Sequence, residues 1–316
     1  MIRVVFLGTP RFALPTLESL LADETTEVVG VMTQPDQPAG RGQRSQSPPV
    51  KAIASDHGIP TLQSHRVKDD SEVMEFFQST LPDVAVAVAF GQLLPRRVFD
   101  FPPHGTLNIH ASLLPKYRGA APIPHALLTG EEVTGVTLMR IEERLDSGPI
   151  LGQEEIPVGR EATSGEIEDL LALRGASLLM RLLVPHVDGQ LDPRAQDDSG
   201  VSYAPMIKKA EACLDWNWPA HRIHNLVRAF NPRPGAYSAL RGQPVKVWRT
   251  KLTSSTLAHL EGGAGSVVRL PRKRIGVLCG DRRVIELVQV QPANRRRMGA
   301  VEFANGIRLG QGEAFG

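Results

Sequence analysis

Short apolar runs of β-type alternate with segments of helical periodicity over roughly the first 185 residues, and this order restricts the fold most strongly. Residues 2–8 form a β-branched apolar run that ends at Gly8, and apolar residues at helical spacing follow it. The same order recurs up to the run at residues 83–90, which is fully apolar after Asp83, and beyond it. Such alternation is typical of a parallel sheet covered by helices, so we predict a Rossmann-like, doubly wound α/β domain.

The composition of the chain changes after residue 188. Residues 189–207 are rich in Asp, Gly and Pro and poor in large apolar side chains, as linkers are. One helical stretch at residues 220–230 then precedes short β-type runs separated by turns, which is the pattern of a small barrel. We therefore predict an α/β domain at residues 1–188, a linker at 189–207 and an OB-like β-barrel domain at 208–316.

Charge is divided unevenly between the two halves of the chain. Residues 208–316 hold 19 Lys and Arg against 7 Asp and Glu, a net charge of +12. The whole chain holds 36 and 34 of these residues, which leaves a net charge of −10 for residues 1–207. A basic domain joined to an acidic one indicates a polyanionic partner, because phosphates are bound largely through Lys and Arg.

Several classes of protein are excluded by simple patterns. Cys213 and Cys279 have no CxxC spacing, so neither a disulfide framework nor a thiolate metal site is expected. The first apolar run is too short for a signal peptide, and no stretch reaches the roughly 18 apolar residues of a membrane helix. We expect a soluble cytoplasmic protein with no membrane segment, and no metal, since the histidines lack ligand spacing: His104, His125, His221 and His224.

Asn108 and His110 lie two residues apart on a predicted strand at residues 105–111, so their side chains leave the same face. Folds of this class bind ligands at the carboxyl ends of their strands, and this strand ends where a loop begins. An amide and a protonated imidazole can together stabilise the oxyanion of acyl or formyl transfer. The residues alone also allow a structural histidine beside an asparagine that forms a turn.

Asp146 lies in a turn after the predicted strand at residues 134–143. In such a turn an aspartate usually caps the local backbone. If the fold brings it beside His110, its charge favours the imidazolium, and it can accept a proton from an attacking amine. Both interpretations stay open at the level of these residues.

Five strings of residues, in this order along the chain, carry a specific resemblance. They are FLGTPRFA, QPDQPAGRGQRSQSPPVK, NIHASLLPKYRGAAPI, TGVTLMRIEERLDSGPIL and FNPRPGAY. The chain closely resembles the methionyl-tRNA formyltransferase family. The resemblance implies a catalytic domain at residues 1–188 and a tRNA-binding barrel at 208–316, joined by the linker.

The same resemblance implies the substrates and the residues that contact them. The donor would be 10-formyltetrahydrofolate and the acceptor the α-amine of methionyl initiator tRNA, with Asn108, His110 and Asp146 as catalytic residues. Two segments would contact the folate: Ser112, Leu113, Leu114 and Pro115, and around the pterin Phe90, Gly91, Gln92 and Leu93. One position departs from the family, because Arg233 stands where a tryptophan is frequent, and this puts the local packing there in doubt.

Two regions would contact the tRNA. The loop at residues 34–49 has four prolines and few apolar side chains, and it resembles a family insertion that engages the acceptor end. Arg41 would contact the tRNA there, helped by Arg44 and Lys51. In the barrel, basic side chains would follow the phosphate backbone: Lys246, Arg249, Arg272, Lys273 and Arg274, with the triplet Arg295, Arg296 and Arg297.

Three other activities compete with this prediction. Formyl transfer to a small amine would use the same Asn, His and Asp, but would not need a basic barrel. A hydrolase that releases formate usually has a regulatory domain ahead of the catalytic one. A non-catalytic RNA-binding protein would not need the three candidate catalytic residues. We therefore expect an enzyme of translation initiation, acting as a monomer.

Overall fold

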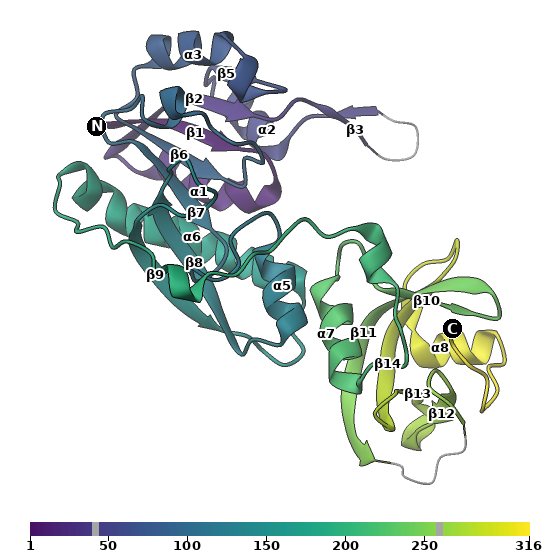
Figure 1. Cartoon of the computed structure of the whole chain (residues 1–316). Helices are drawn as coiled ribbons and strands as arrows, with labels where there is room; N and C mark the ends of the chain where they lie inside the picture. The colour runs from purple at the N-terminus through teal and green to yellow at the C-terminus, as the bar shows by residue number, and fades with distance from the viewer. Residues whose placement is uncertain (40–43, 257–261) are drawn as a thin grey trace. The chain divides into compact units, whose positions relative to one another are not determined.

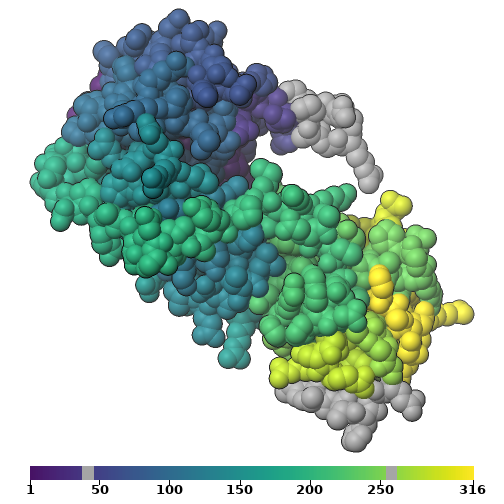
Figure 2. Space-filling view, viewed as in Figure 1, coloured from purple at the N-terminus to yellow at the C-terminus, as the bar shows by residue number. Residues whose placement is uncertain are grey.

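The computed structural model describes residues 1–39, 44–256 and 262–316, with the side chains of residues 38–45 and 254–256 left aside. The described chain divides into two compact units (Figures 1 and 2). The first unit contains Met1–Pro122, Val133–Pro157 and Glu168–Pro205. The second contains Ile123–Glu132, Val158–Ile167 and Met206–Gly316.

A seven-stranded sheet with the order β5-β2-β1-β6-β7-β8-β9 forms the first unit (Figure 1). The strands are β1 (Ile2–Gly8), β2 (Thr26–Thr33), β5 (Thr61–Gln63), β6 (Val84–Val88), β7 (Thr106–His110), β8 (Val133–Arg140) and β9 (Ile150–Pro157). The pairs from β5 to β7 are parallel, whereas β7–β8 and β8–β9 are antiparallel. The predicted Rossmann-like sheet is confirmed, with β8 as the one strand of this seven-stranded sheet that runs against the others.

Helices and a small hairpin complete the first unit. The helices are α1 (Leu14–Ala22), α2 (Pro49–Asp56), α3 (Glu72–Thr80), α4 (Arg96–Phe99) and most of α6 (Ser164–Val187). The hairpin pairs β3 (Gln37–Ala39) with β4 (Arg44–Gln46). All five residues of β6 are buried, as expected for a parallel strand covered on both faces.

The position of α6 brings it close to the strand that carries the candidate catalytic residues. A Cβ on Gly175 would lie 2.6 Å from Cγ2 of Ile109, so only glycine lets the helix pack this closely against β7. By length and composition alone α6 could cross a membrane. Its apolar side is nevertheless used inside the protein, because Leu171, Leu179 and Leu183 are fully buried.

The second unit is built on a curved antiparallel sheet with the order β10-β11-β14-β13-β12, and β15 pairs with β14. These strands are β10 (Tyr237–Leu240), β11 (Gln243–Thr256), β12 (Val267–Arg269), β13 (Ile275–Leu278), β14 (Arg283–Pro292) and β15 (Met298–Gly299). The unit also contains α7 (Ala220–Ala229), α8 (Ala300–Gly306) and nearly all of α5 (Pro122–Thr129). Trp216, Phe230 and Val247 belong to its apolar core. The predicted C-terminal barrel-type domain is confirmed.

Neither compact unit is one continuous stretch of the chain. Ile123–Glu132 and Val158–Ile167 come from the first half of the sequence and group with the second unit. Linker residues 189–205 group with the first unit. The domain boundaries at residues 188 and 207 remain our proposal, because compactness and sequence composition divide the chain differently.

Candidate active site

Strand β7 ends in the middle of the first unit's sheet, between β6 and β8, and carries Asn108 and His110. The alternation of side chains along the strand places both on one face. Asn108 is half-buried, and its amide has no hydrogen-bond partner among the residues that the structure describes. The amide is therefore available to a ligand that reaches this face.

The ring of His110 is 6% exposed and lies between two oxygen atoms. Its Nε2 is 2.9 Å from the carbonyl oxygen of Tyr117, and its Nδ1 is 3.7 Å from Oδ2 of Asp146. A carbonyl can only accept, so Nε2 carries a hydrogen and donates it. The Nδ1 distance exceeds a hydrogen bond, which leaves Nδ1 as the ring nitrogen that can face a reacting group.

Asp146 reaches His110 from the turn between β8 and β9. Its backbone has φ 48°, in the left-handed region, and its side chain is 15% exposed. The carboxylate accepts a hydrogen bond of 2.8 Å from the backbone N–H of Gly119. A Cβ on Gly148 would collide with the carbonyl oxygen of Arg140, so this tight turn requires glycine there. His110 and Asp146 thus come together although 35 residues separate them in the chain, and Asn108 lies on the same face of β7 as His110.

Backbone groups of residues 117–119 complete this arrangement, and sequence reasoning did not find them. The Tyr117 carbonyl holds His110, and the Gly119 N–H holds Asp146. Every residue type carries such groups, so no residue pattern marks them. In the sequence, only the glycine at position 119 could have hinted at them, and the structure shows that it adopts a φ of 121°, which glycine tolerates far better than other residues.

The segment Ser112–Pro115, predicted to contact folate, turns much of its side-chain surface into the protein. Ser112 Oγ donates to the carbonyl of Lys116 over 2.6 Å. Leu114 is buried in a cluster with Met139 and Ile150. Leu113 lies against Gly135, where a Cβ would be too close to it. The buried Ser112 and Leu114 side chains support the loop, and folate contact by this segment remains a proposal that would rely on its exposed atoms.

The segment Phe90–Leu93, predicted to surround the pterin, is also tied to neighbouring loops. The Phe90 carbonyl accepts a hydrogen bond of 3.0 Å from Nε2 of Gln34. Gln92 accepts from the backbone N–H of Val67 over 3.0 Å and donates to the carbonyl of Ser64 over 2.7 Å. Leu93 is 74% exposed and is the side chain of this segment most available to an apolar ligand.

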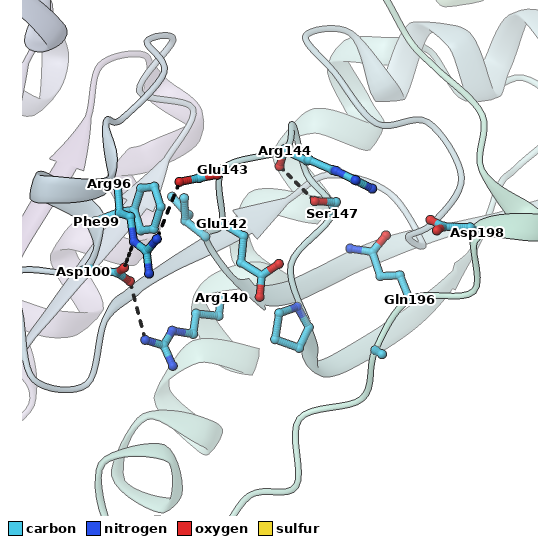
Figure 3. Close-up of a pocket in the computed structure, with 13 residues that line it drawn as sticks. Arg96, Phe99, Asp100, Arg140, Glu142, Glu143, Arg144, Ser147, Gln196 and Asp198 are labelled. Atoms are coloured by element: carbon cyan, nitrogen blue, oxygen red, sulfur yellow. Dashed lines mark hydrogen bonds and ion pairs between the residues drawn. The ribbon is translucent and has the colours of Figure 1, made fainter.

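A polar cavity of about 680 Å³ opens beside the Asp146 turn (Figure 3). Ser147 and Gln196 from the surroundings of that turn contribute to its wall. Opposite charges face each other in it, since Arg96 Nε is 3.1 Å from Asp100 and Arg140 Nη2 is 3.7 Å from the same carboxylate. The remaining residues of its wall are Phe99, Ile141, Glu142, Glu143, Arg144, Pro149, Ala195 and Asp198. None of the residues predicted to contact folate is among the described lining residues.

The predicted tRNA contacts of the first unit are only partly described. Arg41 lies outside the described residues, and Arg44 is placed in β4 without its side chain. Lys51 Nζ donates to Oδ1 of Asp36 over 3.0 Å and to Oε1 of Gln63 over 2.7 Å. The charge of Lys51 is thus balanced at the base of the β3–β4 hairpin, where it supports the hairpin.

The basic residues of the second unit fall into paired and unpaired groups. Arg249 forms a short ion pair with Glu166, whose pKa is held below its usual value by a hydrogen bond from Thr163 and by Arg249. Arg274 Nη1 is 2.7 Å from Glu286. Arg272 and Lys273 are exposed and have no ion pair among the described residues.

The ring of Trp248 contacts two of the remaining basic side chains. The Arg297 guanidinium lies 3.5 Å from the ring centroid of Trp248, and Lys246 Nζ lies 5.2 Å from the same centroid. Lys246 also donates to the carbonyl of Pro234 over 2.9 Å. Arg233, at the position that departs from the family, is exposed. Over residues 1–39, 44–256 and 262–316 no group of three His, Cys, Asp or Glu side chains could hold a metal ion.

Comparison with known proteins gives consistent matches to both parts of the chain. Residues 2–183 match the family model described as formyl transferase, and residues 206–308 match that of the formyl transferase C-terminal domain. The chain is 41% identical over 316 residues to the methionyl-tRNA formyltransferase of Bacillus licheniformis, covering 100% of this chain and 98% of that protein.

Two solved structures share the fold at lower identity. One is HypX from Aquifex aeolicus in complex with tetrahydrofolic acid, with a TM-score of 0.63 and 17% identity, covering 99% of this chain and 48% of that one. The other is the N-formyltransferase from Helicobacter canadensis in complex with folinic acid and dTDP-3-aminofucose. Its TM-score is 0.66 and its identity 19%, with coverage of 92% of this chain and 100% of that one.

Proposed function

The chain belongs to the formyl transferase family, and we propose that it transfers a formyl group from 10-formyltetrahydrofolate to the α-amine of methionyl initiator tRNA. The observation that carries this function is the match along the whole chain, at 41% identity, to a protein named methionyl-tRNA formyltransferase. The product serves the start of translation, so we propose that the enzyme acts in the cytoplasm, as a monomer.

Transfer to an amino sugar is the nearest alternative, because the N-formyltransferase whose structure holds dTDP-3-aminofucose shares the fold. Two observations favour the tRNA. The methionyl-tRNA formyltransferase of Bacillus licheniformis is 41% identical to this chain, against 19% for the N-formyltransferase from Helicobacter canadensis, and residues 208–316 carry a net charge of +12. Cations in this number favour a polyanion over a small amine, since each phosphate contact releases counterions.

We propose that the folate donor binds along the two segments that the family resemblance assigns to it, Ser112–Pro115 and Phe90–Leu93. The first segment follows β7 directly, so a donor held there can present its formyl group to Asn108 and His110. In the second segment, the exposed Leu93 can pack against the pterin. The polar cavity beside the Asp146 turn is not part of this proposal, because neither these segments nor Asn108 and His110 are among its described lining residues.

Catalysis would follow from the groups around the end of β7. The methionyl amine attacks the formyl carbon, and the resulting oxyanion accepts hydrogen bonds from the Asn108 amide and from Nδ1 of a protonated His110. Asp146, at 3.7 Å from that nitrogen, stabilises the positive ring and accepts the proton that the amine loses. The bond from the formyl carbon to N10 then breaks, and N10 takes up one proton, which balances the reaction.

A comparison of acceptors tests this function. The purified enzyme and formyl-labelled donor are offered charged initiator tRNA, free methionine and an amino-sugar nucleotide in parallel reactions. We expect label on the tRNA and background levels on the two small amines. Label on a small amine alone would assign the enzyme to that substrate and overturn the tRNA as acceptor.

The unpaired cations of the second unit predict a specific salt dependence. In the double variant Arg272→Ala/Lys273→Ala, the slope of log affinity for tRNA against log salt should become shallower by about 1–2, as each lost phosphate contact changes it by about 0.7–0.9. Binding titrations from low to moderate salt measure this slope.

Arg249→Ala is the matched control, because the Arg249 charge is already paired with Glu166. Its slope should change by less than that of the double variant. Equal slopes for the double variant and the unchanged protein would show that the two exposed cations do not contact the tRNA.

A further inference from the structure

The chain leaves the first unit through residues 194–204, here called the connecting segment. This segment lies within the predicted linker, yet it is hydrogen-bonded to the loops around the candidate active site. Ala204 N–H donates to the carbonyl of Arg118, and Arg118 N–H donates to the carbonyl of Ser202, each over 2.8 Å. From these contacts we propose that Gln196 is a positioning residue for formyl transfer, which fixes the turn holding Asp146; this inference rests on the proposed function.

The side-chain amide of Gln196 is saturated with hydrogen bonds. Its Nε2 donates to the carbonyl of Asp146 over 2.9 Å and to the carbonyl of Gly148 over 2.8 Å. Its Oε1 accepts from Nε and Nη2 of Arg118 over 3.1 Å and 2.8 Å. A glutamine amide has two donor hydrogens and two acceptor lone pairs, so all four are used and its orientation is fixed.

Arg118 connects this amide to the other side of the Asp146 turn. Its side chain is buried, with 5% of the residue exposed, and it directly precedes Gly119, whose N–H donates to the Asp146 carboxylate. Asp146 is thus held twice, through its carboxylate by Gly119 and through its carbonyl by Gln196. Arg118 connects the two contacts. Its guanidinium binds the Gln196 side chain, and its peptide bond leads to the Gly119 N–H that binds the Asp146 carboxylate.

The conformation of Asp146 explains why the turn needs this support. Its φ of 48° is unusual for a residue other than glycine, and such a backbone persists only where surrounding contacts impose it. Without Gln196, the Asp146 and Gly148 carbonyls lose a shared donor. The turn can then relax, and the carboxylate can move away from Nδ1 of His110.

The connecting segment also supports the other partner of His110. Ser202 Oγ accepts a hydrogen bond of 2.9 Å from the N–H of Tyr117, whose carbonyl accepts from Nε2 of His110. Tyr117 itself has φ 62°. Both oxygen atoms that flank the His110 ring therefore belong to residues that the connecting segment holds in left-handed conformations.

Two variants of Gln196 test the proposal. Gln196→Leu removes all four hydrogen bonds, and Gln196→Glu keeps acceptors for Arg118 but cannot donate to the two carbonyls. We expect kcat for formylation of methionyl-tRNA to fall about 10–100-fold in both, within the range for misplaced catalytic groups, with KM for tRNA and donor within about threefold of normal. Thermal unfolding establishes that each variant is folded. If Gln196→Leu does not fold, the near-isosteric Gln196→Glu still tests the proposal.

Asp197→Asn is the matched control. Asp197 is the next residue of the same segment, is exposed, and uses its carboxylate to accept hydrogen bonds from Ser199. Its kcat should stay normal. A normal kcat in Gln196→Glu would overturn the proposal.

A double-variant cycle separates positioning from a general loss of structure. If Gln196 acts through Asp146, then adding Gln196→Glu to Asp146→Asn should cause almost no further loss of kcat. A further loss as large as in the unchanged background would overturn the proposal. Failure of the proposed function is distinguishable from both results, because the unchanged enzyme would then form no formylmethionyl-tRNA.

Discussion

Replacing His110 by alanine is expected to lower kcat for formyl transfer by about 10²–10⁴-fold, the range for a positioned donor of protons or hydrogen bonds. The ring donates from Nε2 to the Tyr117 carbonyl and places Nδ1 3.7 Å from the Asp146 carboxylate, and alanine offers neither ring nitrogen. KM for both substrates should change little, because the lost interaction forms mainly in the transition state. Single-turnover rates of formylmethionyl-tRNA formation measure the effect.

His57→Ala serves as the control for this experiment, since His57 is exposed at the end of α2. Its rate should equal that of the unchanged enzyme. A rate for His110→Ala within about threefold of normal would rule out a catalytic role for His110. Because His110 is buried, a matched unfolding temperature is needed before a large loss is attributed to chemistry.

Asp146→Asn is expected to lower kcat by about 10²–10³-fold with the fold intact. Asparagine has nearly the shape of aspartate, and its side-chain oxygen can still accept the hydrogen bond from Gly119 N–H. The variant removes the negative charge 3.7 Å from Nδ1 of His110 and the group that accepts the amine proton. Single-turnover formylation, with kcat and KM resolved, measures the loss.

The exposed Asp169→Asn on α6 is the corresponding control and should be fully active. The double variant His110→Ala/Asp146→Asn should lose less than the product of the two single losses, because one of the two roles of Asp146, the stabilisation of the charged ring, requires His110. Losses that simply multiply would show that the two residues act independently.

The local sequence was sufficient for the main features of the fold. The apolar run of β6 and its flanking turns predicted a buried parallel strand, because strand burial leaves a direct signal in composition. The two-residue spacing of Asn108 and His110 likewise placed both on one face of β7. The reversed direction of β8 was not predicted, since strand direction depends on chain topology.

The groups that hold His110 and Asp146 in place could not be predicted from sequence patterns, for a physical reason. The Tyr117 carbonyl and the Gly119 N–H are main-chain groups that every residue offers. Gln196 is 50 residues from Asp146 and 78 from Arg118 along the chain, and only tertiary structure brings them together. Composition indicated a linker there, and the hydrogen bonds hold that segment against the loops around His110 and Asp146.

Charge patterns were informative about the second unit as a whole and not about single residues. The net charge of +12 indicated a polyanionic partner, whereas the ion pairs of Arg249 with Glu166 and Arg274 with Glu286 depend on which strands become neighbours. Arg272 and Lys273 are therefore better candidates for phosphate contacts than Arg249 and Arg274.

The most direct measurement of the central claim is the stoichiometry of a single reaction that contains enzyme, formyl-labelled 10-formyltetrahydrofolate and excess methionyl initiator tRNA. Tetrahydrofolate and formylmethionyl-tRNA are quantified at the same time points. We predict that they appear in equal amounts, and that both are lost together in His110→Ala. Tetrahydrofolate released with free formate, without label on the tRNA, would identify a hydrolase and contradict the proposed transfer.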